Sequence, residues 1–333
     1  MKRSTAGDSQ GATGFVTRVP KLGKDLVNRP LWTVLIPTRN CGSYLQETVQ
    51  SVLQQDRGVE QMEIIILDDC SDDPSEAQSW TAQTQGRVRV LRHETNVGKS
   101  ANYQSGLEAS RGHLIHVLHG DDFVRPNFYQ TMEACFEQYP GAGAFFSESE
   151  YIDEQGEVIG RTGQLQPTCG ILESFAERQY VNQQIQTPSI VMRRTVYESV
   201  GGFDHRLTAF EDWEMWFRAS LSFPVGFNSN ARAAYRVSSG NTSTASVLEG
   251  RRPRLFRLVL DIMDRYCPDE IKSRKKHQRA EAIAECLLQF SLVAARHRAW
   301  IPWIRIFCQS ILHVRSWRQL RRVVGATLRG FIG

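Results

Sequence analysis

The sequence lacks any apolar run long enough for a membrane-spanning helix, and its first twenty residues lack the hydrophobic segment of a secretory signal. Its seven cysteines include no CxxC pair, so neither a structural zinc site nor a small disulfide scaffold is indicated. Walker A loops, G-x-G-x-x-G loops and internal repeats are also missing. These absences predict a protein of the reducing cytoplasm with buried thiols.

Charge is distributed unevenly along the chain. Residues 251–333 contain 18 Lys and Arg against 6 Asp and Glu, whereas residues 1–250 contain 22 against 30. An acidic body therefore precedes a basic C-terminal region. A basic surface favours an anionic partner, such as phospholipid headgroups, nucleic acid or a diphosphate-bearing substrate.

Apolar periodicity divides the chain into a disordered tail (1–29), a domain of alternating strands and helices (30–245) and a basic helical region (246–333). Strands are predicted at 31–36, 62–67, 87–91, 114–118 and 142–147, and helices at 43–54, 75–85, 99–110, 126–138, 255–266, 281–295 and 301–314. Strands separated by helices predict an α/β fold with a mostly parallel, Rossmann-like sheet flanked by helices.

Two predicted strands end in paired aspartates, Asp68-Asp69 and Asp121-Asp122. Because ligands bind beyond the carboxyl ends of parallel strands, we expect both pairs at one edge of the sheet. The second pair suits Mg²⁺ or Mn²⁺ bound to a diphosphate, since these cations prefer oxygen ligands. Taken alone, each pair also fits a turn or a helix N-cap.

Two further segments carry candidate chemistry. Lys99 follows Gly98 at the start of a predicted helix, where a phosphate group could bind. Glu211 and Asp212 begin an amphipathic helix, and a carboxylate there could remove the proton of an acceptor hydroxyl. The alternative for this helix is a capped core helix whose tryptophans are simply buried.

The order of these motifs is more specific than each motif alone. Over about residues 31–243 the chain closely resembles the family 2 glycosyltransferases, which have the GT-A fold. The segments that carry the resemblance are Pro37-Thr38-Arg39-Asn40, Asp68-Asp69, Asn96-Val97-Gly98-Lys99, Asp121-Asp122, Gly201-Gly202-Phe203-Asp204 and Glu211-Asp212-Trp213.

The resemblance implies inverting transfer of a sugar from a nucleotide-sugar, mostly UDP-linked, with Mn²⁺ or Mg²⁺ as cofactor. By matched position, Asp212 is the general base with Glu211 beside it, and Asp121 and Asp122 are the metal ligands. The residues implied in nucleotide-sugar binding are Pro37, Arg39, Asn40, Asp68, Asp69, Ser71, Asn96, Lys99 and Asp121.

Three positions depart from the family pattern. Arg39 replaces an aromatic residue, and Gln104 replaces a common Asn. His119 replaces the Asp with which the family's acidic motif, here Asp121-Asp122, often begins. The last change bears on metal ligation. A nucleotidyltransferase is the alternative enzyme, but no Gly-rich or basic triphosphate loop follows Pro37. A non-catalytic GT-A-fold binding module is the second alternative, although the acidic motif and the base are both present.

The basic C-terminal region has two interpretations. Arginines mixed with aromatic residues are typical of helices on an anionic membrane surface, which suits a polyprenyl-diphosphate-linked saccharide acceptor. The same periodicity fits helices packed on the catalytic domain, and the sequence leaves both open. We expect no nucleic-acid partner, a cytoplasmic or peripheral location on the cytoplasmic face of the membrane, and a role in surface polysaccharide or O-antigen synthesis.

Overall fold

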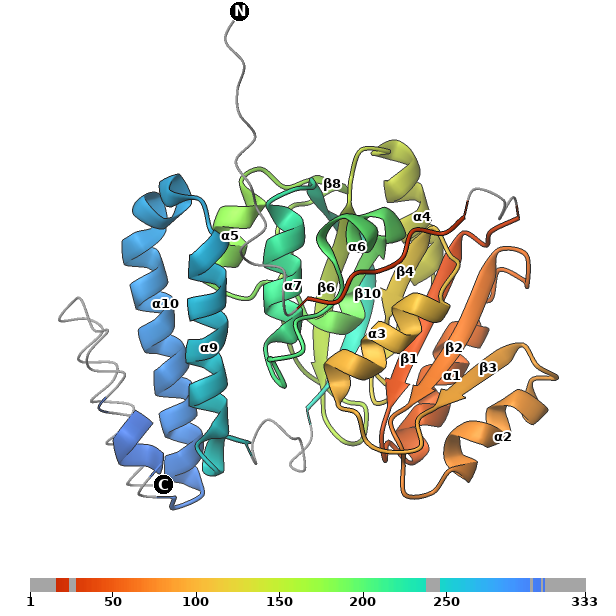
Figure 1. Cartoon of the computed structure of the whole chain (residues 1–333), viewed down its shortest axis with the longest axis horizontal. Helices are drawn as coiled ribbons and strands as arrows, with labels where there is room; N and C mark the ends of the chain where they lie inside the picture. The colour runs from red at the N-terminus through yellow and green to blue at the C-terminus, as the bar shows by residue number, and fades with distance from the viewer. Residues whose placement is uncertain (1–15, 24–27, 238–245, 300–301, 307, 309–333) are drawn as a thin grey trace, which may run out of the picture.

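A mixed β-sheet forms the centre of the protein (Figure 1). The fold is a computed structural model that describes residues 16–23, 28–237, 246–299, 302–306 and 308. Within these residues the strand order is β3-β2-β1-β4-β9-β6-β10-β5, with β7 paired to β6 and β8 to β10. The strands are β1 (Trp32–Thr38), β2 (Met62–Asp68), β3 (Val88–Arg92), β4 (Leu114–Val117), β5 (Phe123–Val124), β6 (Ala144–Ile152), β7 (Val158–Arg161), β8 (Gly170–Ile171), β9 (Ile190–Arg193) and β10 (Val225–Arg236).

The first half of the sheet has the predicted parallel arrangement. Strand β1 pairs in parallel with both β2 and β4, and β2 pairs in parallel with β3. Every residue of β1 and β2 is buried, because helices cover both faces of the sheet. The α/β fold is therefore confirmed. The second half is mixed, since β9 runs antiparallel to β4 and β6, and the hairpin strand β7 is antiparallel to β6.

Helices cover the two faces of the sheet in separate groups. One face carries α1 (Ser43–Leu53), α2 (Ser75–Gln83) and α4 (Phe128–Gln138). The other carries α3 (Lys99–Ala109), α5 (Phe175–Val181), α6 (Arg194–Val200) and α7 (Glu211–Ser220). Alternate residues of β1 separate accordingly, with Val34 in the first apolar cluster and Leu35 in the second.

Two C-terminal helices, α9 (Arg251–Tyr266) and α10 (Asp269–Arg296), lie beside α5 and α7 (Figure 1). Their buried side chains, including Phe256 and Phe290, form one apolar cluster with Trp213 and Phe217 of α7. Pro253 lies in the first turn of α9, where proline is tolerated, and does not break the helix. Packing on the catalytic domain thus accounts for the apolar faces of both helices.

None of the helices in the described part of the chain combines the length and the apolar character needed to cross a bilayer. The helix predicted at 301–314 lies mostly outside the described residues.

Residues 16–23 correct part of the prediction of a disordered tail. They run along the surface of the domain, where Val16 forms a bridge with Asp204 and Val19 is buried. The carbonyl of Thr17 accepts a hydrogen bond of 3.0 Å from the backbone N–H of Gly202. Burial of Val19 and the backbone pairing hold this segment in place. The segment is too short to show a periodic apolar pattern, so no sequence signal indicates it. Residues 1–15 and 24–27 lie outside the described residues.

The cysteines also differ from the prediction of thiols alone. Cys135 of α4 and Cys169, next to β8, form a disulfide. They are 34 residues apart and belong to no sequence motif, so only the folding of α4 against the segment before β8 brings them together. Free thiols are found at Cys41, Cys70, Cys267, Cys286 and Cys308.

Candidate active site

The loops that follow β1, β2 and β4 meet at one edge of the sheet. The backbone N–H of Asp69 donates to the carbonyl of Thr38 at 3.0 Å, and that of Gly120 donates to the carbonyl of Pro37 at 2.9 Å. A cavity of about 480 Å³ opens beside these loops. The carboxyl ends of parallel strands thus form a binding edge, as expected for an open α/β sheet.

Seven of the residues predicted to bind a nucleotide-sugar line this cavity: Pro37, Arg39, Asn40, Asp69, Asn96, Lys99 and Asp121. Asp68 and Ser71 lie behind the wall. The Ser71 hydroxyl donates to Asp68 Oδ1 at 2.6 Å, and Asp68 forms an ion pair with Arg92. Both residues therefore shape the turn after β2, and direct contact with a ligand stays a prediction for them.

Asp69 fixes the loop that leads into α3. Its two carboxylate oxygens accept the backbone N–H groups of Val97 at 2.7 Å and Gly98 at 3.0 Å. Gly98 has φ of +84°, a conformation that L side chains rarely adopt. The next residue, Lys99, places its ammonium 2.9 Å from the Glu211 carboxylate. This ion pair links the cavity wall to the first turn of α7, although neither Glu211 nor Asp212 is among the described residues that line the cavity.

The predicted base, Asp212, is half-buried in the first turn of α7. Its Oδ2 accepts hydrogen bonds from Gln183 Nε2 at 2.7 Å and from Thr187 Oγ1 at 3.1 Å, while Oδ1 accepts the Trp213 N–H at 2.8 Å. Burial and the neighbouring Glu211 raise the pKa of Asp212, and Lys99 opposes that rise. A carboxylate with a raised pKa is a better proton acceptor than an ordinary aspartate.

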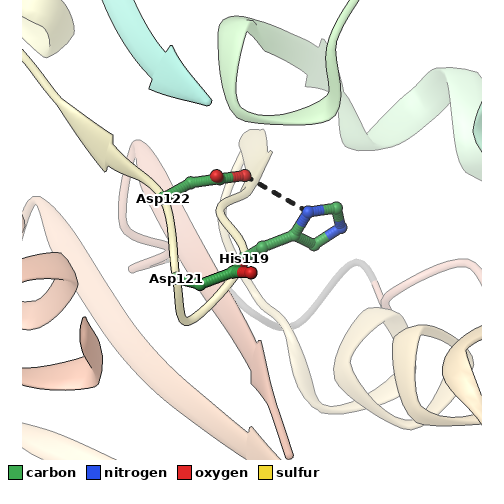
Figure 2. A group of neighbouring side chains, drawn as sticks. All are labelled: His119, Asp121 and Asp122. Atoms are coloured by element: carbon green, nitrogen blue, oxygen red, sulfur yellow. Dashed lines mark ion pairs between the residues drawn. The ribbon is translucent and has the colours of Figure 1, made fainter. Parts of the chain in front are cut away.

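The acidic motif and His119 form a cluster whose candidate ligand atoms lie within 4.8 Å of one another (Figure 2). Asp122 is only 1% exposed; its Oδ1 accepts the Arg236 N–H at 2.8 Å, and its Oδ2 lies 3.3 Å from His119 Nδ1. Burial and Asp121 raise the pKa of Asp122 to about 6, and His119 opposes the rise.

This cluster fits a divalent cation. Two carboxylates and an imidazole are common ligands of Mn²⁺, and the Asp122 Oδ2 is buried without completing a hydrogen bond of good geometry within the described residues. Asp121 and His119 line the cavity, whereas Asp122 lies beneath them. His119 thus occupies the ligand position at which the sequence departs from the family pattern.

Tyr103 interacts with two acidic pairs of the site, Asp121-Asp122 and Glu211-Asp212. Its hydroxyl lies 2.7 Å from His119 Nε2, and its side chain is buried. Burial raises the pKa of Tyr103, and the carboxylates of both acidic groups add to the rise: Glu211, Asp212, Asp121 and Asp122. Both acidic pairs therefore act electrostatically on the same phenol.

Sequence reasoning missed several residues of the cavity wall. The largest are Tyr103, Tyr235, Arg236, Arg251 and Arg252. Arg236 is the last residue of β10, a strand that the sequence analysis did not predict. Tyr103 lies within α3, where nothing distinguishes it from a core tyrosine. The two arginines of α9 belong to a charge-rich segment that also fits a solvated helix face.

A comparison with known families decides the class of protein. The family model described as Glycosyl transferase family 2 matches residues 33–201, about half of the chain. The chain belongs to this family. It is 31% identical over 260 residues to the Mycobacterium tuberculosis (strain CDC 1551 / Oshkosh) protein MT1568, which is itself uncharacterized by name. The aligned region covers 74% of this chain and 80% of the relative.

Solved structures show that this glycosyltransferase has the GT-A fold. It aligns with S. aureus TarS 1-349 in complex with UDP-GlcNAc at a TM-score of 0.54 and 15% identity, over 83% of this chain and 88% of TarS. It aligns with GalNAc-T7, solved with UDP, GalNAc and Mn²⁺, at a TM-score of 0.55 and 17% identity, over 77% of this chain and 51% of GalNAc-T7.

Proposed function

We propose that this glycosyltransferase transfers a sugar from a UDP-linked donor to a hydroxyl of a saccharide acceptor, with inversion at the anomeric carbon. One observation carries the proposal: His119 and Asp121 line the same cavity as Lys99, and the Lys99 ammonium forms an ion pair with Glu211 in the first turn of α7. The UDP-GlcNAc bound by TarS and the UDP bound by GalNAc-T7 support a UDP-linked donor.

Asp212 is the proposed general base. Its carboxylate would take the proton of the acceptor hydroxyl, through the lone pair of Oδ1 that the Trp213 N–H leaves open, as the hydroxyl oxygen attacks the anomeric carbon and the bond to the departing diphosphate breaks on the opposite face. One such displacement inverts the carbon. Gln183 and Thr187 hold the carboxylate by hydrogen bonds and so fix its direction of approach.

Asp121, Asp122 and His119 would hold Mn²⁺ or Mg²⁺, and the Mn²⁺ in the GalNAc-T7 structure supports this assignment. When bound, the cation supplies positive charge that stabilises the departing diphosphate. Arg236 supports these ligands, since its backbone N–H binds Asp122 and its Nε donates to the carbonyl of Asp121 at 2.9 Å.

The acceptor is proposed to be a saccharide or a polyprenyl-diphosphate-linked saccharide used in surface polysaccharide or O-antigen synthesis. The enzyme would then work in the cytoplasm or on the cytoplasmic face of the membrane. Because α9 and α10 bury their apolar sides against α5 and α7, a membrane contact by these two helices would use their exposed basic residues, such as Arg254 and Arg257.

The test is a panel of nucleotide-sugars assayed with Mn²⁺ and Mg²⁺ by release of the nucleoside diphosphate. We expect turnover with a UDP-sugar and a loss of at least about a hundredfold in Asp212→Asn, because a positioned base contributes about that much or more. UDP affinity should stay near the wild-type value in this variant. Asp261→Asn, on the exposed side of α9, is the matched control.

Two results would contradict the proposal. Full activity of Asp212→Asn would remove the base assignment. Absence of both UDP binding and turnover across the panel would remove the donor class.

A further inference from the structure

Two arginines from outside the matched family segment belong to the wall of the cavity. Arg251 and Arg252 form the start of α9, and both line the cavity together with Leu255. The family match ends at residue 201, so it assigns no role to α9. Their presence makes the C-terminal helices part of the active-site wall.

Arg252 is held in a defined position by aromatic rings. Its guanidinium carbon lies 4.7 Å from the centre of the Phe210 ring and 5.9 Å from that of Phe290. Phe210 directly precedes Glu211 and has φ of 66°, so its ring extends from the turn that carries the proposed base. Arg252 is close enough to Lys99 to oppose the rise of the Lys99 pKa.

The wall contains more basic than acidic side chains, and three of the basic ones have acidic partners outside it: Lys99 pairs with Glu211, Arg236 with Glu47 and Arg251 with Glu249. Its cations within the described residues are Arg39, Lys99, Arg236, Arg251 and Arg252, whereas its carboxylates are Asp69 and Asp121. Both oxygens of Asp69 are bound to backbone N–H groups. A concave site lined by these basic groups favours a ligand that carries negative charge.

We propose that Arg252, with Arg251 beside it, binds a phosphate group of a substrate in this cavity. The inference rests on the proposed function, and it assigns α9 a direct part in substrate binding. A guanidinium binds phosphate through parallel N–H groups, and the rings of Phe210 and Phe290 lie beside the guanidinium of Arg252. The phosphate comes either from the donor diphosphate or from a phosphate carried by the acceptor.

The test measures binding, so it does not depend on knowing the acceptor. UDP and uridine are titrated by calorimetry in the presence of Mn²⁺, and glycerol phosphate is titrated with and without saturating UDP. The variants are Arg252→Gln, Arg252→Lys and the matched control Arg254→Gln, which changes an exposed arginine of the same helix outside the cavity wall. Thermal melting of each variant checks its fold.

If the phosphate belongs to the donor, Arg252→Gln weakens the affinity for UDP at least about tenfold, because a charge-assisted hydrogen bond is lost. The affinity for uridine stays unchanged. If the phosphate belongs to the acceptor, Arg252→Gln weakens the affinity for glycerol phosphate by a similar factor and leaves the affinity for UDP unchanged. In either case Arg252→Lys loses less affinity than Arg252→Gln, and Arg254→Gln binds as the wild type does.

The inference is overturned if Arg252→Gln binds both phosphates as the wild type does, or if the wild type binds neither. A wild type that binds glycerol phosphate through Arg252 but does not bind UDP would instead contradict the proposed donor and support the arginine site. The two hypotheses therefore fail in different titrations.

Discussion

The Lys99 ammonium lies 2.9 Å from the Glu211 carboxylate, and this ion pair connects the first residue of α3 with the first residue of α7. Glu211 is buried, whereas the Lys99 side chain is about half exposed. Burial acts to lower the pKa of Lys99, but Glu211 and Asp212 raise it above its ordinary value. The starts of α3 and α7 thus share one electrostatic environment.

The first prediction concerns Glu211→Gln. Glu211 adds to burial in raising the pKa of Asp212, so its removal should lower that pKa. The acidic limb of the pH profile of kcat/KM should then move to lower pH, because Asp212 stays ionised further into acid. Glu60→Gln, an exposed and distant change, should leave the profile unaltered. An unmoved acidic limb in Glu211→Gln would show that the two carboxylates are not coupled.

The second prediction has the opposite sign. Thr187 Oγ1 donates to Asp212 Oδ2 at 3.1 Å, and a donor to the ionised form lowers a pKa. Thr187→Val removes the donor at similar volume, so the acidic limb should move to higher pH. Gln183→Leu should act in the same direction, since Gln183 donates to the same oxygen at 2.7 Å. A shift to lower pH in both variants would contradict the assignment of these hydrogen bonds.

The third prediction concerns the metal. Removal of divalent cations with EDTA should abolish transfer, and added Mn²⁺ should restore it. Asp121→Asn should weaken Mn²⁺ binding by at least about tenfold, since even residues that only support a ligand have effects of this size. Spin-resonance titration of Mn²⁺ measures the affinity, with Asp261→Asn as control. Transfer that persists in EDTA would rule out a required metal.

The fourth prediction concerns stability and His116, which is buried with Nε2 2.9 Å from the carbonyl of Pro188 and Nδ1 3.1 Å from the Tyr129 hydroxyl. Burial lowers its pKa to about 4. In the unfolded chain an ordinary histidine binds its proton near pH 6.5, so stability should fall as pH drops from that value toward 4. The loss due to this one group should be about 2 to 3 kcal/mol by pH 4.5.

Urea unfolding at pH 7.5 and pH 4.5 measures this loss. His116→Gln should be less stable at neutral pH but should lose less between the two pH values than the wild type. His277→Gln changes an exposed histidine and should keep the wild-type dependence. Identical pH dependence in all three proteins would mean that His116 does not stay neutral in the fold.

Local signals predicted the first, parallel half of the sheet. The apolar runs of β1 and β2 and the helical spacing of α1 need only neighbouring residues to be recognised. The ends of β2 and β4 then predicted that Asp69 and Asp121 face one cavity. The family resemblance added the roles, and the family match confirms the class of enzyme.

What the sequence did not predict depends on contacts between distant segments. The hydrogen bond from Arg236 to Asp122 joins residues 114 positions apart, and no periodicity encodes it. Arg252 was ambiguous for a similar reason, because the rings that hold it come from α10 and from the turn before α7. The antiparallel position of β9 between β4 and β6 also follows from long-range pairing alone.

The position of β10 has a consequence for synthesis of the chain. This strand lies between β6 and β5, yet it begins at Val225, more than seventy residues after the end of β6. As the nascent polypeptide leaves the ribosome, β6, which contains Phe145 and Phe146, therefore lacks its partner on one edge until β10 emerges. During that interval the edge is open to pairing with strands of other chains.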